Sequence, residues 1–488
     1  MAGGARDRTV VVSAPGKVLL AGGYIVLDRK HTGLVFGLSA RIHVLAQEIH
    51  TSAGVHLSEI VVQSPQFLNA TWRFGYHLVE NGGGIKVTQL QSCVSLSCLS
   101  RTCRLTHHLR GTPVEPNHFV ETTLNYVLTY IAHVDKSRAS HGFQPASLLV
   151  LADNDYYSKP KHADDRPSSS SSASSTAAPA APQTEKHARP RFRHFGTTLR
   201  DAHKTGLGSS AAIVTSLTAA LLSHYLPPSL FDLTTPQGRR VLHNLAQVAH
   251  CSAQGKIGSG FDVASAVYGS CLYRRFSPTL LATLPSPGQP LFGAALAALV
   301  EDEDGNQWDC EIRQDRVALP PGVAIRMCDV DCGTETVSMV KKVHQWRDAN
   351  PELAADVYAR LQGRVDELAG VLREHKTAEI GAVMGPVREI MRTLGRDSGV
   401  PIEPESQEAM LDALEGLEGV LGSVVPGAGG YDAAAVVMRD DAETEKRVRE
   451  FLREWSGRNE IQVRLMKVKG ETEGARTEDV GEFKAWLQ

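Results

Sequence analysis

Residues 204–212 are the part of this chain best suited to bind phosphate. Gly206 and Gly208 permit a sharp turn and a close approach of the backbone to a ligand. The apolar pattern that begins at Ser209 predicts a helix, and the first amide groups of a helix have no partner within it. These amides and the positive end of the helix dipole attract anions. The predicted nucleotide-binding residues are Lys204, Thr205, Gly206, Leu207, Gly208, Ser209, Ser210 and Ala211.

Three other interpretations of this stretch compete with this one, and the sequence argues against the first two. A Walker loop requires Gly-x4-Gly-Lys-[Ser/Thr], a string that the chain does not contain. Gly206, Gly208 and Ala211 formally satisfy a dinucleotide-binding pattern, but residues 200–203 are polar, whereas that pattern follows an apolar strand. A plain helix cap made of glycine and serine also fits the composition.

Apolar periodicity predicts the strands and helices that must position the glycine loop. In the first part of the chain we expect strands at 9–13, 18–20, 42–48 and 270–276, and helices at 117–133, 209–224, 237–254 and 262–267. From Val323 onward we expect a first strand, further strands at 433–438 and 461–467, and helices at 336–346, 351–374, 380–394, 405–417 and 442–455. This order favours an α+β fold in two domains that divide near residue 320.

The composition changes abruptly between residues 158 and 193. This segment contains five consecutive serines at 168–172, repeated Ala-Pro pairs and almost no large apolar residue. Such a segment buries too little apolar surface to offset the entropy that it would lose on ordering. Because strands precede it and the glycine loop follows it, we predict a disordered insertion within the first domain.

The overall composition argues against several classes of protein. The 488 residues include 51 basic and 54 acidic side chains, and the formal net charge of −3 gives no basic excess for binding nucleic acid. No window approaches the roughly 20 consecutive apolar residues of a membrane helix, and residues 1–9 lack the pattern of a secretory signal. We expect a cytoplasmic protein without an obligate protein partner.

Eight cysteines in a chain of this length are too few for a disulfide scaffold. Cys93, Cys98 and Cys103 follow one another at intervals of five, and Cys328 precedes Cys332 by four. Neither set gives the two close pairs that a structural zinc site normally shows. We therefore expect free thiols.

Three segments resemble, in order, the motifs of one kinase superfamily. Residues 13–20 read Ser-Ala-Pro-Gly-Lys-Val-Leu-Leu, residues 205–212 read Thr-Gly-Leu-Gly-Ser-Ser-Ala-Ala, and residues 426–432 read Pro-Gly-Ala-Gly-Gly-Tyr-Asp. They resemble motifs 1, 2 and 3 of the GHMP kinases, the superfamily of galactokinase, homoserine kinase, mevalonate kinase and phosphomevalonate kinase. One such motif alone is weak evidence, but three in this order are strong.

Finer features resemble the fungal phosphomevalonate kinases. Mevalonate kinases usually continue motif 1 with Gly-Glu-His, whereas this chain has Gly-Gly-Tyr at 22–24. Residues 246–251, 254–264 and 331–342 also resemble the fungal group. The resemblance implies a ribosomal-S5-like N-terminal domain at 1–320, which contains the insertion 158–193, and a ferredoxin-like C-terminal domain at 321–488, with the active site between them.

The reaction that this resemblance implies is transfer of the ATP γ-phosphoryl group to (R)-5-phosphomevalonate, a step toward isoprenoids and sterols. Lys17 is expected to contact the transferring group, and Asp262 to orient Lys17 and the substrate. The acceptor phosphate is already mostly ionised near neutral pH, so a strong base is less necessary. A surface lysine and a helix N-cap remain the alternatives for these two residues. Mevalonate kinase activity, and a non-catalytic sensor on the same fold, also stay open.

Further contacts to the substrate are expected from three segments of the chain. Lys256 is a candidate for holding the 5-phosphate of the substrate, with a solvated loop lysine as the alternative. The expected substrate-binding residues are Ser13, Lys17, Lys256, Ser259, Gly427, Ala428 and Gly429.

The implied magnesium site departs from the pattern of the mevalonate kinases. Those enzymes carry a glutamate one or two helical turns before the catalytic aspartate, whereas this chain has His250, Cys251 and Gln254 there. Magnesium keeps several waters and binds few protein groups. The implied protein ligands are therefore Ser209 and Ser210, assisted by the catalytic aspartate and by the phosphates themselves.

Overall fold

The computed structural model describes residues 9–52, 58–90, 114–158, 190–305, 307–330, 336–459 and 461–487. Most of the predicted insertion at 158–193 lies outside these ranges. The same is true of four of the cysteines that were predicted to be free thiols, Cys93, Cys98, Cys103 and Cys332. Within the ranges, the prediction is confirmed for Cys251, Cys271, Cys310 and Cys328.

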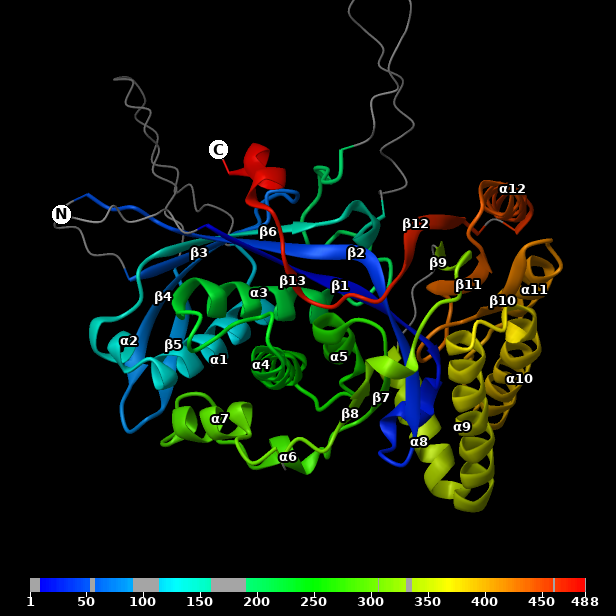
Figure 1. Ribbon diagram of the computed structural model, residues 1–488, viewed down its shortest axis with the longest axis horizontal. Helices are drawn as coiled ribbons and strands as arrows, with labels where there is room; N and C mark the ends of the chain where they lie inside the picture. The colour runs from blue at the N-terminus through cyan, green and yellow to red at the C-terminus, as the bar shows by residue number, and fades with distance from the viewer. Residues whose placement is uncertain are drawn as a thin grey trace, which may run out of the picture.

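Thirteen strands in the described ranges form one sheet (Figure 1). They are β1 (Val10–Ala21), β2 (Thr32–Glu48), β3 (Glu59–Gln63), β4 (Thr71–Val79), β5 (Gly84–Gln89), β6 (Ala146–Ala152), β7 (Cys271–Arg274), β8 (Glu311–Arg313), β9 (Val323–Val330), β10 (Val420–Val424), β11 (Ala433–Arg439), β12 (Val463–Glu471) and β13 (Arg476–Thr477). The main path runs β10-β11-β9-β12-β2-β6-β3-β4-β5, while β1 and β7 also pair with β2. Strand β2 therefore joins the two halves of the sheet.

Helices cover the sheet in two groups. They are α1 (His118–Val134), α2 (Lys136–His141), α3 (Ser209–Tyr225), α4 (Pro236–Gln254), α5 (Phe261–Tyr268), α6 (Thr279–Ala282), α7 (Phe292–Glu301), α8 (Thr336–Ala349), α9 (Pro351–Arg373), α10 (Ile380–Ser398), α11 (Glu405–Glu415) and α12 (Ala442–Asn459). In Figure 1, α1, α3, α4, α5 and α7 lie beneath the N-terminal strands, and α8 to α12 lie with β9, β10 and β11 at the other end. The mixture confirms the predicted α+β class. No helix in the described ranges is long and apolar enough to cross a membrane.

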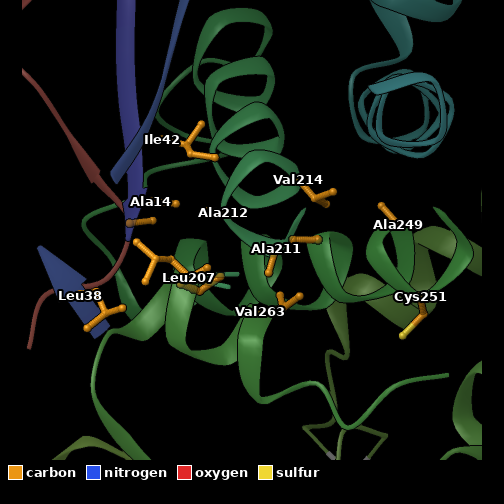
Figure 2. Close-up of a cluster of buried hydrophobic side chains, with 14 of the residues drawn as sticks. Ala14, Leu38, Ile42, Leu207, Ala211, Ala212, Val214, Ala249, Cys251 and Val263 are labelled. Carbon is orange, nitrogen blue, oxygen red and sulfur yellow. The ribbon is translucent and has the colours of Figure 1, made fainter. Parts of the chain in front are cut away.

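Helix α3 is the buried centre of the N-terminal half. It is apolar on nearly all sides, which is typical of a helix enclosed by other elements. Ala211 and Ala212 are buried, and Figure 2 shows them with Leu207, Val263 and Ala249, which come from the glycine loop, α5 and α4. A second core cluster packs α11 and α12 against β9 to β12. The tight packing of α3 fixes the position of the loop that precedes it.

Several observed elements differ from the predictions. The strand predicted at 42–48 is the last part of the longer β2. The strands predicted at 9–13 and 18–20 are one strand, β1, because Pro15 and Gly16 form a register shift against β2 rather than a turn. Helix α7 was not predicted, since it is brief and follows the Pro- and Ser-rich residues 277–290. The shorter helices α2 and α6 and the strands β3 to β6, β8, β10 and β13 were not predicted either. The other predicted helices agree with the structure to within a few residues at each end.

The end of the chain returns to its beginning. Strand β12 pairs with both β9 and β2, and β13 pairs with β1. The 3-10 helix η5 (Val480–Trp486) then places Phe483 in a buried cluster with Val11 and Leu45. The division into domains at residue 320 stays a prediction, and the last residues of the chain lie against the strands of the first part.

Candidate active site

Strand β1 contains the first of the three segments that resemble kinase motifs, and its backbone contacts the other two. It pairs with β2 along most of its length. Beyond the short pairing of β1 with β13, the Lys17 amide donates to the Leu207 carbonyl at 2.9 Å, and the Gly427 amide donates to the Leu19 carbonyl at 3.3 Å. Segments that lie far apart in sequence are therefore brought together by backbone hydrogen bonds to one strand.

Two glycines are required where these segments meet. Gly208 has a φ of +83°, and a Cβ atom there would lie 2.9 Å from both Cγ and Cε of Lys17. Gly429 has a φ of +85°, and its Cβ atom would lie 2.2 Å from the Ile402 carbonyl oxygen. Side chains rarely adopt this backbone conformation, and contacts this short do not occur. Gly208 thus permits Lys17 to pack on the glycine loop, and Gly429 permits the glycine turn to pack against Ile402.

The Lys17 side chain lies across the glycine loop. Its Nζ donates to the Gly206 carbonyl at 3.3 Å and stands 5.8 Å from the centre of the Phe261 ring. Burial lowers the pKa of Lys17 because desolvation disfavours the ammonium form, while the nearby Asp262 carboxylate acts in the opposite direction. An ammonium group has three N–H donors, so a ligand anion can share it with the carbonyl.

Asp262 lies in the first turn of α5, close to Lys17. The N-cap of this helix is Gly260, so the alternative that Asp262 serves as the helix cap is wrong. One carboxylate oxygen accepts from the Val263 amide at 3.0 Å, and the other lies 3.8 Å from Nε2 of His250. The side chain is 22% exposed, so a ligand can reach it. Its negative charge is stabilised by the N-terminal end of the helix dipole.

A cavity of about 820 Å³ lies beside the start of α3. Lys204, Ser209 and Ser210 line it, so three of the eight residues predicted to bind nucleotide face this cavity. Much of the remaining wall is apolar or aromatic and includes Phe67, Trp72, Phe119, Leu199 and Ile213. An apolar cavity of this volume with a few polar groups is typical of a site for a small molecule.

The other residues of the loop use their side chains to hold it in place. The Thr205 hydroxyl donates to the Asp155 carbonyl at 2.6 Å. Leu207 and Ala211 are buried, and in Figure 2 their side chains lie in the core near Ala14 and Val263. These three residues can therefore offer a ligand only their backbone groups.

Ser13, which was predicted to bind substrate, is engaged inside the protein. It is completely buried, and its hydroxyl donates to Glu478 Oε1 at 2.6 Å. The hydroxyl oxygen of Ser13 also accepts from Arg41 Nε at 2.7 Å. The structure brings together Lys17, Asp262 and the glycine loop but does not bring the Ser13 hydroxyl to them.

The remaining predicted substrate residues lie in two loops. Lys256 is exposed just after α4, and the Ser259 carbonyl accepts from the Tyr273 hydroxyl at 2.8 Å. In the glycine turn, the Ala428 carbonyl accepts from the Tyr24 hydroxyl at 2.7 Å, which ties the turn to the segment after β1. Both loops flank the segments that meet on β1.

Two neighbours of the site were not assigned from the sequence. Tyr157 makes a hydrogen bond with the Ser209 side chain, and burial raises the pKa of its hydroxyl. His250 Nε2 lies 3.1 Å from the Ser210 hydroxyl oxygen. A histidine and a glutamine one turn apart on a helix with a buried face, at 250 and 254, were the available signal for His250.

Comparison with known proteins agrees with this geometry. Residues 197–270 match the family model for the N-terminal domain of GHMP kinases. The phosphomevalonate kinase of Gibberella zeae is 52% identical over 98% of this chain and 99% of its own length. That of Aspergillus fumigatus is 40% identical over 98% of both chains.

A solved structure supports the fold. The phosphomevalonate kinase of Streptococcus pneumoniae, in complex with phosphomevalonate and AMPPNP, superposes with a TM-score of 0.56, covering 95% of this chain and all of that one. At 16% identity this likeness concerns the fold alone. The two fungal relatives, which are similar from end to end, decide the family: this chain belongs to the phosphomevalonate kinases.

Proposed function

We propose that the protein transfers the γ-phosphoryl group of ATP to (R)-5-phosphomevalonate, giving (R)-5-diphosphomevalonate and ADP. The observation that carries the proposal is the convergence of Lys17 and Asp262 on the glycine loop at the start of α3. The family supports the choice of substrate. The pneumococcal enzyme, solved with phosphomevalonate and AMPPNP, supports a nucleotide and a substrate on this fold.

The nucleotide fits the cavity beside α3. Its base would lie against the apolar wall that includes Trp72 and Leu199, and its phosphates would lie at the helix start with Ser209, Ser210 and Lys204. Backbone amides at a helix N-terminus bind phosphate because they are unpaired and lie at the positive end of the dipole.

Phosphoryl transfer between two anionic molecules depends mainly on position and on charge neutralisation. Lys17 would contact the transferring group, since its ammonium lies against the glycine loop. Asp262 would keep Lys17 charged and oriented, because its carboxylate opposes the effect of burial on the pKa of that lysine. A strong base is not required, since the acceptor phosphate is already mostly ionised near pH 7.

Magnesium fits this site as an ion that arrives with the nucleotide. In the part of the chain that the structure describes, no three His, Cys, Asp or Glu side chains gather to hold a metal ion by themselves. The oxygen donors available are the hydroxyls of Ser209 and Ser210 and the Asp262 carboxylate, which suit a hard cation that keeps several waters. When bound, the ion would neutralise part of the phosphate charge.

The substrate would enter between the loop at 255–260 and the glycine turn at 426–430. Ser259, Gly427, Ala428 and Gly429 would line its path with backbone groups, and Lys256 is the proposed partner of the 5-phosphate. The exposure of Lys256 supports this role, because the side chain is free to reach an incoming anion.

We also propose that the protein acts in the cytosol. The free thiols at Cys251, Cys271, Cys310 and Cys328 suit a reducing compartment. Fluorescence microscopy of the tagged full chain would test this, and a punctate distribution within an organelle would contradict it.

The reaction is tested by measuring ADP release with 5-phosphomevalonate and, in parallel, with mevalonate. We expect turnover with 5-phosphomevalonate and none with mevalonate, and phosphorus NMR should show a diphosphate product. Turnover with mevalonate alone would overturn the substrate assignment. Absence of ADP release with either substrate, from protein that binds AMPPNP, would overturn the enzymatic function.

A further inference from the structure

His250 lies behind Ser210, which lines the cavity, and beside Asp262. It lies in the last turns of α4 and is 2% exposed. Its ring packs against Phe119, which lines the cavity, with 6.0 Å between ring centres. Its Nε2 atom lies 3.1 Å from the Ser210 hydroxyl oxygen and 3.8 Å from the Asp262 carboxylate. One imidazole nitrogen therefore faces both the helix start and the catalytic aspartate.

The neighbours of Nε2 define its role as an acceptor. The Gln254 side-chain amide nitrogen lies 3.0 Å from Nε2, and an amide nitrogen can only donate. When the imidazole proton is on Nδ1, the single lone pair of Nε2 is an acceptor, and the Ser210 hydroxyl donates to it while the Gln254 amide shares the same lone pair. A hydroxyl that donates its proton to His250 on α4 directs its oxygen lone pairs away from His250. For Ser210 this direction is the cavity, which the residue lines.

We propose that His250 is a positioning residue that accepts the proton of the Ser210 hydroxyl and so turns the oxygen of Ser210 toward the nucleotide phosphates. This inference rests on the proposed function for the place of the phosphates. It also gives a role to the position at which the sequence lacks an acidic residue. The imidazole at this position accepts the proton of the Ser210 hydroxyl, whereas a carboxylate there would itself bind the cation.

The experiment compares substitutions that remove or retain the acceptor. His250→Leu removes it at similar size, and His250→Gln retains a side-chain oxygen that can accept. We expect AMPPNP, in the presence of Mg²⁺, to bind roughly tenfold more weakly to His250→Leu when measured by calorimetry. The reason is that the Ser210 oxygen is no longer held toward the charged phosphates, so its interaction with them is lost. His250→Gln should recover most of this loss. The KM for ATP should rise more than kcat falls.

A double-mutant cycle separates an effect through Ser210 from a general one. If His250 acts through Ser210, the variant with both His250→Leu and Ser210→Ala should bind AMPPNP no more weakly than Ser210→Ala alone. His243→Leu is the matched control, since His243 is buried two turns earlier in α4 and contacts Asn244 and Trp308 instead. We expect it to change thermal stability without changing AMPPNP affinity.

Several outcomes would overturn the inference. They are unchanged AMPPNP binding in His250→Leu, losses that multiply in the double variant, or a folded His250→Gln that binds as weakly as His250→Leu. Should His250→Leu fail to fold, His250→Ala, which also removes the acceptor, replaces it in the cycle with Ser210→Ala. These are binding measurements, so a wild-type protein that binds AMPPNP but does not phosphorylate 5-phosphomevalonate would refute the proposed function separately.

Discussion

Two polar clusters lie four residues apart on β1 and differ in how their charges are paired. Around Ser13, the Arg41 guanidinium donates to the serine hydroxyl, to Glu471 at 3.1 Å and to the Gly474 carbonyl. Around Lys17, the ammonium makes one hydrogen bond within the described residues, to the Gly206 carbonyl at 3.3 Å. Both positions belong to the segment that resembles motif 1, and both were predicted to bind substrate.

The difference separates a structural cluster from a functional one. Buried charges are stable when they are paired and hydrogen-bonded, and the 1% exposed Arg41 side chain meets that condition. A cation that lies on the glycine loop with one hydrogen bond in the described part of the chain is instead a candidate for binding an anion. We therefore expect substitutions near Ser13 to change stability, and substitutions near Lys17 to change catalysis.

The largest expected effect is on turnover, from Lys17→Met. Removing one group that stabilises transferring charge lowers kcat by roughly 10³-fold, about 4 kcal/mol. The free energy of unfolding should not fall, because the buried ammonium group is desolvated and removing it relieves that cost. Steady-state kinetics and urea unfolding measure the two quantities. Lys86→Met, which changes an exposed lysine on β5, is the control and should match the wild type.

The next effect is on stability, from Arg41→Met. This change leaves Glu471 and Glu478 without their buried partner, and breaking such a cluster costs about 3 kcal/mol of unfolding free energy. The value lies at the lower end of the usual range because Arg476 still pairs with both glutamates. Urea unfolding measures the loss. If Arg41→Met instead lowered kcat and left stability unchanged, the distinction between the two clusters would fail.

The contrast also marks how far the sequence could predict this protein. The loop before α3 and Lys17 were found because their chemistry and motif are local. The burial of Ser13 was not predicted, because its partner Glu478 lies 465 residues away in sequence. Glu478 is brought to Ser13 by the pairing of β13 with β1 and lies just before η5. The helix that carries His250 was predicted, but its contact with Ser210 depends on how α4 packs beside α3. Local patterns predict elements and motifs, whereas partners across the fold depend on packing.

A smaller effect on turnover is expected from Asp262→Asn. A general base contributes about 10²–10⁴-fold, but here the acceptor phosphate is already ionised, so we expect a loss of about 10-fold to 100-fold. Asn keeps the shape of the side chain and removes the charge that supports Lys17. A kcat close to that of the wild type would remove Asp262 from the mechanism, and a loss as large as that of Lys17→Met would indicate that it acts as a true base.

The smallest effect is a change in acid sensitivity, which belongs to the cluster around Ser13. His43 is fully buried, lies 3.6 Å from Asp153 and 3.1 Å from an Arg191 nitrogen, and has Glu478 at 4.0 Å. Burial lowers its pKa. The unfolded chain therefore binds a proton more readily than the folded protein, and stability falls as the pH drops below about 6.5. The pKa values of Asp153 and Glu478 are also lowered, so their contributions are lost only at more acidic pH.

His43→Gln should therefore flatten the pH dependence of stability without changing catalysis. Urea unfolding at pH 7.5 and 5.5 brackets the ordinary histidine pKa of about 6.5, which applies to the unfolded chain, and leaves both carboxylates ionised. We expect the wild type to lose more unfolding free energy between these values than the variant, while both have the same kcat at pH 7.5. An equal loss in both proteins would show that His43 does not take up the proton. A changed kcat would show that the cluster around Ser13 influences the site at Lys17. The two clusters on β1 would then have to be treated as one functional unit.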